Sequence, residues 1–153
     1  MIMKLIILAV GRGRNMPEAA LAGSWMSRIH GGSDIIEIES KLPAGPYRQQ
    51  DESNRLLHHI DPGTPLVACD PRGRDTASEK LAEMIGNWRD AGHGAASFAI
   101  GGADGHHDIL TRRADRIISF GAATWPHMLF RAMLAEQLYR ATTILAGHPY
   151  HRG

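Results

Sequence analysis

Three short segments of small or polar residues each end or follow an apolar run, and together they have the composition of a ligand pocket. The segments are residues 69–71, 101–105 and 121–124. Glycine lets a ligand approach the backbone closely, and open parallel sheets bind ligands beyond the carboxyl ends of their strands. Any one segment is more typical of a tight turn, but the three together make a cofactor pocket as good an interpretation as three turns.

The C-terminal residues form a second group with chemical potential. Tyr150, His151 and Arg152 bring a phenol, an imidazole and a guanidinium together. An imidazole titrates near neutral pH and accepts a proton, and a guanidinium binds a phosphate or an anionic base. Chain ends are usually frayed, so the residue types leave a disordered tail as the alternative.

The segment Gly-Arg-Gly at residues 11–13 permits three interpretations. A dinucleotide-binding fingerprint needs a third glycine where this chain has Met16, with an acid such as Glu37 further along. A basic loop would instead present Arg12 and Arg14 to RNA phosphates. An ordinary surface turn is the third interpretation.

Metal binding is not expected, although six of the nine histidines lie at or beyond His93. Two groups are conceivable, namely the pair His148 and His151, or His106 with its two following residues. Neither has a recognised spacing of ligands such as H-E-x-x-H, and the single cysteine offers no set of thiolates.

Composition indicates a cytoplasmic protein that folds without disulfides. Cys69 is the only cysteine, so a disulfide framework is excluded and a reducing compartment is favoured. The apolar stretch at residues 5–10 is too short to span a bilayer, and no cleavage pattern of a signal peptide follows it. Of the 17 basic residues 14 are arginine, which suits RNA phosphates but also reflects a GC-rich genome.

The elements that must position these residues alternate between strand and helix. The predicted strands are residues 4–10, 34–39, 65–70, 95–100 and 116–120. The predicted helices are residues 17–30, 48–60, a helix introduced by a capping box at 76–79, 107–114 and 126–146. This order predicts an α/β fold with an open, largely parallel sheet and helices on both faces. Without repeats or linkers, residues 1–153 form one predicted domain.

The last predicted helix has an unusually broad apolar band. Thr124 is suited to cap it, and Pro126 to an early helical position. Gly147 and Pro149 are expected to stop it. The band is typical of a core helix and equally of a helix that packs against a second subunit.

With these motifs in hand, the sequence resembles the bacterial ribosomal large subunit methyltransferase H family, in the SPOUT (trefoil-knot) methyltransferase class. The resemblance is densest in the last 60 residues. The matching pieces are residues 4–10 with their glycine, Phe-Ala-Ile-Gly-Gly-Ala-Asp-Gly at 98–105, Thr-Trp-Pro-His at 124–127, Arg131, Ala-Glu-Gln-Leu-Tyr-Arg at 135–140 and His-Pro-Tyr-His-Arg at 148–152. It is their combination that is specific.

This resemblance implies an S-adenosylmethionine-dependent enzyme that methylates N3 of a pseudouridine in 23S rRNA, on the assembled ribosome. It also implies a homodimer and a C-terminal trefoil knot, although chains generally do not thread loops. The implied cofactor-binding residues are Cys69, Gly101, Gly102, Phe120, Gly121, Ala122, Ala123, Thr124 and Trp125. The sequence departs from the family pattern at two places. Cys69 stands where the family usually has a leucine-like residue, and Phe-Gly-Ala-Ala at 120–123 stands where the family usually has a Ser or Leu-rich loop.

For the chemistry we nominate the tail. His151 and Arg152 would remove the N3 proton or stabilise the anionic base, and Tyr150 would position that base. No metal and no membrane are implied. A Rossmann oxidoreductase based on residues 11–13 and a non-catalytic RNA-binding module based on the arginines are the alternatives.

Overall fold

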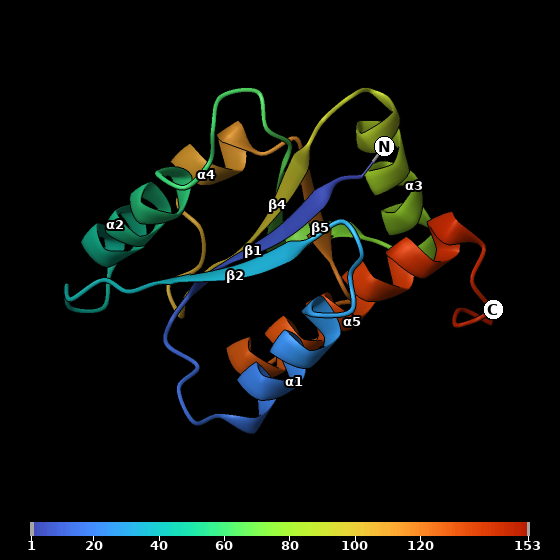
Figure 1. The fold of residues 1–153 in the computed structure, drawn as a ribbon. Helices are drawn as coiled ribbons and strands as arrows, with labels where there is room; N and C mark the ends of the chain where they lie inside the picture. Colours follow the sequence, from blue (N-terminus) through green and yellow to red (C-terminus); the bar gives the residue numbers. More distant parts are fainter. Residues whose placement is uncertain (1, 153) are drawn as a thin grey trace.

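The computed structural model describes residues 2–152, in which strands and helices alternate along the chain (Figure 1). The strands are β1 (Lys4–Val10), β2 (Ser33–Ile38), β3 (Leu66–Asp75), β4 (Ala95–Ile100) and β5 (Arg116–Ser119). The helices are α1 (Pro17–Met26), α2 (Pro46–Leu57), α3 (Ser78–Asp90), α4 (Asp108–Arg113) and α5 (His127–Ala146). The predicted α/β class and the order of its elements are confirmed.

All five strands are parallel and form one sheet in the order β2-β1-β4-β3-β5. Helices α1, α3 and α5 cover one face, and α2 and α4 cover the other (Figure 1). Side chains of a strand alternate between the faces, so Leu5 and Ile7 enter the core under α5 while Leu8 enters the core under α2. Because β4, β3 and β5 are neighbours, their carboxyl ends lie side by side at one edge of the sheet.

Strand β3 runs further than the predicted residues 65–70. An irregularity after Cys69 takes up residues 70–73, and β3 then pairs again with β5 at Arg74 and Asp75. A Cβ on Gly73 would lie 2.8 Å from the backbone of Ile117 and Ile118, so the close approach requires glycine. The predicted strand stops at Asp70, before Pro71 and Gly73, since proline and glycine usually end a strand. The trefoil knot implied by the resemblance stays a prediction.

Three predicted helix starts are wrong in detail. α2 begins at Pro46 rather than residue 48, since proline suits the first helical position. The capping box does not form, because α3 is capped by Ala77 and the Thr76 hydroxyl donates to the carbonyl of Arg74. Pro126 rather than Thr124 is the N-cap of α5.

Helix α5 ends as predicted. Gly147 adopts φ 70°, the left-handed conformation that terminates many helices. Its apolar residues Leu134, Leu138 and Ala141 are buried beneath the sheet, α1 and α3. Among residues 2–152, no helix has both the length and the apolar character that a membrane crossing needs.

Candidate active site

The three predicted loops meet around one cavity of about 270 Å³ at the carboxyl ends of β3, β4 and β5. All the predicted cofactor-binding residues line it except Ala122. The lining residues are Cys69, Asp70, Pro71, Ile100, Gly101, Gly102, Ala103, Gly105, His106, Ser119, Phe120, Gly121, Ala123, Thr124, Trp125, His127 and Phe130. The inference that these loops share one pocket is therefore confirmed, while the ligand that the pocket binds is a separate question.

Sequence reasoning missed the buried imidazole of His106. Its Nε2 donates to the carbonyl oxygen of Ala99 at 3.1 Å, and its Nδ1 has no hydrogen-bond partner within the described chain. Burial lowers the pKa of His106, so the ring is neutral at physiological pH. The sequence suggests a role for His106 only as a conceivable metal ligand. Within residues 2–152, no three His, Cys, Asp or Glu side chains gather as a metal site would require.

Aromatic rings form the wall of the cavity on the α5 side. Phe120 stacks on Phe130 with ring centroids 5.2 Å apart. The indole N–H of Trp125 donates to the carbonyl of Phe120 at 3.2 Å, which folds the loop before α5 back on itself. The apolar band of α5 could have indicated Phe130 as a partly buried residue, but the sequence has no signal for its stacking on Phe120.

Neither the thiol nor the carboxylate that lines the cavity has the character of a nucleophile. Burial raises the pKa of the Cys69 thiol to about 12, which leaves it protonated and inert. The Asp70 carboxylate accepts hydrogen bonds from the backbone N–H and the guanidinium of Arg72, and these lower its pKa. Cys69 and Asp70 are thus suited to shaping the cavity rather than to reacting with a ligand.

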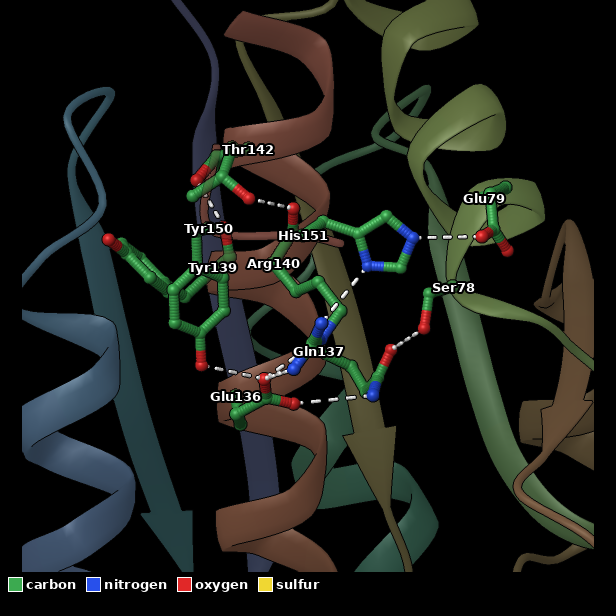
Figure 2. A network of polar contacts seen from close by, with 10 residues as sticks. Ser78, Glu79, Glu136, Gln137, Tyr139, Arg140, Thr142, Tyr150 and His151 are labelled. Carbon is green, nitrogen blue, oxygen red and sulfur yellow. Dashed lines mark hydrogen bonds and ion pairs between the residues drawn. The ribbon is translucent and has the colours of Figure 1, made fainter. Parts of the chain in front are cut away.

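Of the nominated tail residues, Tyr150 and His151 lie in a separate polar network on α5 and α3 (Figure 2), whereas Arg152 is exposed and donates from Nε to the carbonyl of Pro149 at 3.2 Å. The Tyr150 hydroxyl donates to Glu136 Oε1 at 3.0 Å. His151 bridges two charged side chains, with Nδ1 3.0 Å from Arg140 and Nε2 2.8 Å from Glu79 Oε1. Burial and the bond to Glu136 raise the pKa of Tyr150, so the phenol stays protonated and acts as a donor.

Aromatic packing around Tyr150 adds to the hydrogen bonds that fix the tail. The ring of Tyr150 meets Tyr139 at 5.0 Å and Trp25 at 5.9 Å between centroids, both edge to face. The guanidinium of Arg140 lies 4.9 Å from the centroid of Tyr150. Tyr150 and His151 are therefore docked against α5, α3 and α1, and a frayed end, the alternative that the sequence left open, does not describe these two residues.

Within one chain the structure does not bring the tail and the cavity together. His127 lines the cavity, whereas the α5 residue that contacts His151 is Arg140, 13 positions further along the helix. At 1.5 Å per residue this separation is about 20 Å. A site that uses both groups of residues cannot be assembled from one chain in this conformation.

The loop at residues 11–16 is anchored from beneath by a buried ion pair. Arg131 of α5 donates to Glu37 and, at 3.1 Å, to the carbonyl of Gly11. The N–H of Gly13 donates to the same carboxylate of Glu37 at 2.7 Å. Burial alone would raise the pKa of Glu37, but Arg131 and Gly13 together lower it. The amide that a pyrophosphate would need is thus already engaged, which argues against a dinucleotide site.

Comparison with known proteins agrees with this arrangement. The family described as predicted SPOUT methyltransferase matches residues 3–151. The chain belongs to the SPOUT methyltransferases. It is 47% identical over 151 residues to ribosomal RNA large subunit methyltransferase H of Paramagnetospirillum magneticum, and 48% identical over 151 residues to that of Rhodospirillum rubrum; each alignment covers 98% of this chain and 99% of the relative. The corresponding protein of Methylorubrum populi is 46% identical over 161 residues, covering 99% of this chain and 98% of the relative.

SPOUT methyltransferases use S-adenosylmethionine as the methyl donor, and the cavity suits that molecule. Glycines at 101, 102, 105 and 121 expose backbone amides and carbonyls to a ligand. The stacked rings of Phe120 and Phe130 add an apolar wall. Small residues and aromatic rings around a few polar groups are typical of sites for nucleoside-sized ligands.

Gly101→Val is expected to abolish detectable binding of S-adenosylmethionine. A Cβ at this position would lie 3.2 Å from the backbone of Gly105 and 3.3 Å from the His106 ring, so a branched side chain must displace the loop. Gly94→Val, at the other end of β4 with no neighbour within 4 Å of its Cβ, is the matched control. Calorimetric titration of both folded variants checks this, and unchanged affinity in Gly101→Val would rule out the assignment.

Proposed function

We propose that this protein transfers a methyl group from S-adenosylmethionine to N3 of a pseudouridine in 23S rRNA, on the assembled large subunit. The relatives carry the name of a large subunit rRNA methyltransferase. The single observation that carries the proposal is the cavity at three adjacent strand ends, lined by the loops that match the family. The proposed place of action is the cytoplasm.

The chain's own contribution to this reaction is orientation and the handling of one proton. Bound S-adenosylmethionine supplies a methyl group already activated by its sulfonium. The loops at 101–105 and 120–125 would hold that methyl in line with the N3 lone pair, and holding reactants in line removes much of the entropic barrier. Transfer of the methyl group from sulfur to N3 would require the N3 proton to leave, and His151 is the proposed acceptor once its Nδ1 releases the hydrogen bond from Arg140.

The tail that carries this acceptor is proposed to come from a second copy of the chain. The tail lies about 20 Å along α5 from the cavity of its own chain. In a two-fold dimer the tail of each chain would reach the partner's cavity. Arg152 would then face the anionic base, and Tyr150 would position that base.

A dimer of twice the chain mass is expected by light scattering at micromolar concentration. The apolar band of α5 is largely covered within the chain, but Leu129 of α5 and Leu21 of α1 remain 39% and 49% exposed beside a groove of about 500 Å³. Leu21→Glu with Leu129→Glu should shift the mass toward the monomer, whereas a like change at exposed Ile109 should not. A monomeric wild-type protein would count decisively against shared active sites.

Arg12 and Arg14 are expected to contact RNA phosphates. Both side chains are exposed, and the groove beside them measures about 750 Å³. Arg12→Ala with Arg14→Ala should weaken ribosome binding and lower its salt slope by about 1.5, since each lost phosphate contact removes roughly 0.7–0.9. Arg112→Ala with Arg116→Ala removes the same charge from α4 and β5 and serves as control. Equal slopes for the two variants would leave residues 11–16 as a surface turn.

Methylation of purified ribosomes with labelled S-adenosylmethionine, followed by mapping of the modified base, tests the proposal. We expect label at N3 of one pseudouridine and none on free 23S rRNA. Titration with NAD separates the oxidoreductase alternative, for which Gly13 has no free amide to offer. Binding of ribosomes without binding of S-adenosylmethionine would instead favour a non-catalytic RNA-binding module.

A further inference from the structure

Helix α2 buries polar side chains where a core helix usually buries apolar ones. Arg48, Gln49, Glu52 and Ser53 lie on one face of α2, as their spacing in a helix requires. Glu52 is only 6% exposed and Ser53 only 1%. Burying a polar group is costly unless it finds a partner, so the partners of this face indicate its purpose.

Those partners belong to the glycine loop, residues 101–107, more than 50 positions away in the sequence. Arg48 Nε donates to Asp104 Oδ2 at 2.6 Å. Gln49 Nε2 donates to the carbonyl of Asp104 at 2.8 Å. The backbone N–H of His107 donates to Ser53 Oγ at 2.9 Å. The polar face of α2 therefore forms hydrogen bonds with residues 104 and 107 of the loop, and its side chains do not line the cavity.

Glu52 lies directly behind the loop. A Cβ on Gly102 would lie 2.9 Å from Val10 Cγ1 and 3.0 Å from Glu52 Oε2, so these two side chains together occupy the space that a side chain would need. Oε1 of Glu52 is buried with no hydrogen-bond partner among the described residues, and burial raises the pKa of this carboxyl group. An unsatisfied buried oxygen calls for an explanation, and contact with Gly102 is the one that the structure offers.

We propose that the polar face of α2 holds residues 101–107 in the shape that binds the cofactor, and that Arg48 and Glu52 are positioning residues. Gly101 and Gly102 line the cavity, whereas Arg48 and Glu52 do not. They would thus act on cofactor affinity through the loop. This inference rests on the proposed function, since it takes S-adenosylmethionine as the ligand of the cavity.

Arg48→Ala and Arg55→Ala make a matched test. Each removes one ion pair from α2, but Arg48 is paired with Asp104 of the loop and Arg55 with Asp51 of the helix itself. We expect Arg48→Ala to raise the dissociation constant of S-adenosylmethionine about tenfold, as loss of a supporting partner typically does, and to leave kcat at saturating cofactor within about twofold. Arg55→Ala should change neither quantity.

Hydrogen exchange of the cofactor-free protein supplies a readout independent of binding. The amide of Gly105, bonded to the carbonyl of Gly102 at 3.0 Å, should exchange faster in Arg48→Ala than in Arg55→Ala. If the wild type bound no S-adenosylmethionine, the proposed function would fail. The exchange rate of the Gly105 amide would still show whether Arg48 holds the loop 101–107 in place. Equal exchange and equal affinity in the two variants would overturn the inference.

Variants of Glu52 separate space filling from helix stability. Glu52→Gln keeps the volume behind Gly102 and should bind S-adenosylmethionine like the wild type, whereas Glu52→Ala should bind it about tenfold more weakly. Adding Gly102→Ala to Glu52→Ala should cost less affinity than Gly102→Ala alone, because only Val10 then obstructs the new methyl group. Wild-type affinity in folded Glu52→Ala would contradict the role of Glu52. If Glu52→Ala fails to fold, the comparison of Arg48→Ala with Arg55→Ala tests the inference instead.

Discussion

Replacing Arg131 by methionine is expected to lower the free energy of unfolding by about 3 kcal/mol, the typical cost of removing one partner from a buried ion pair. Only 3% of the Arg131 side chain and 27% of the Glu37 side chain are exposed, so the carboxylate left behind is largely withheld from water. Among residues 2–152, Gly13 would remain the only hydrogen-bond donor to this carboxylate. Urea unfolding should show a lower midpoint with an unchanged slope.

Two controls define the origin of this loss. Lys80→Met breaks the exposed pair with Glu83 and should cost about 0.5 kcal/mol or less. Glu37→Met with Arg131→Met removes both charges and should recover most of the stability. A double variant no more stable than Arg131→Met would show that the lost stability comes from the packing of Arg131 and from the hydrogen bonds to Gly11 and Gly13, rather than from the unpaired carboxylate.

The stability difference should also depend on pH, with a defined sign. The pKa of Glu37 in the folded protein lies below its ordinary value of 4.5. A depressed carboxyl pKa contributes stability above the unfolded value and loses it as the pH falls. Protonated Glu37 no longer needs its partner, so wild type and Arg131→Met should converge as the pH drops below 4.5.

The sequence predicted the layers of the fold because its apolar patterns are unambiguous. The runs that became β1 and β4 are short, apolar and bounded by glycine, as strands buried on both faces are. The path after Cys69 was beyond such reasoning, since Pro71 and Gly73 usually end a strand. Here they form an irregularity held by the backbone of β5, and a contact of that kind has no local signal.

The candidate site was predicted to different depths in its two parts. The cavity loops follow from a general rule about parallel sheets, together with small residues at three strand ends. The contacts between α2 and these loops could not be predicted, because Arg48 and Asp104 lie far apart in the sequence. The polar residues of α2 also carry no sequence signal of burial. The docking of His151 between Arg140 and Glu79 was likewise invisible, since it joins three elements.

Removing residues 150–153 is expected to abolish measurable methyl transfer, a loss of about 10³-fold, because a positioned acid–base group contributes roughly 10²–10⁴-fold. The cofactor affinity should persist, since none of the described residues 150–152 lines the cavity. A chain that lacks only Gly153 is the control. Stability should fall modestly with the loss of the packing between Tyr150 and Tyr139. Full activity in the truncated enzyme would eliminate the catalytic assignment of the tail.

Mixing the truncated chain with a Gly101→Val chain then asks which cavity the tail serves. If each tail reaches the partner, a heterodimer has one complete site, composed of the truncated chain's intact cavity and the other chain's intact tail. Random association of equal amounts makes half of the dimers mixed, so about a quarter of the wild-type activity should return. If each tail serves its own chain, neither site is complete and mixing restores nothing. The separation of about 20 Å between Arg140 and His127 along one α5 favours the first outcome, because the tail would otherwise have to leave Glu136, Arg140 and Glu79 altogether.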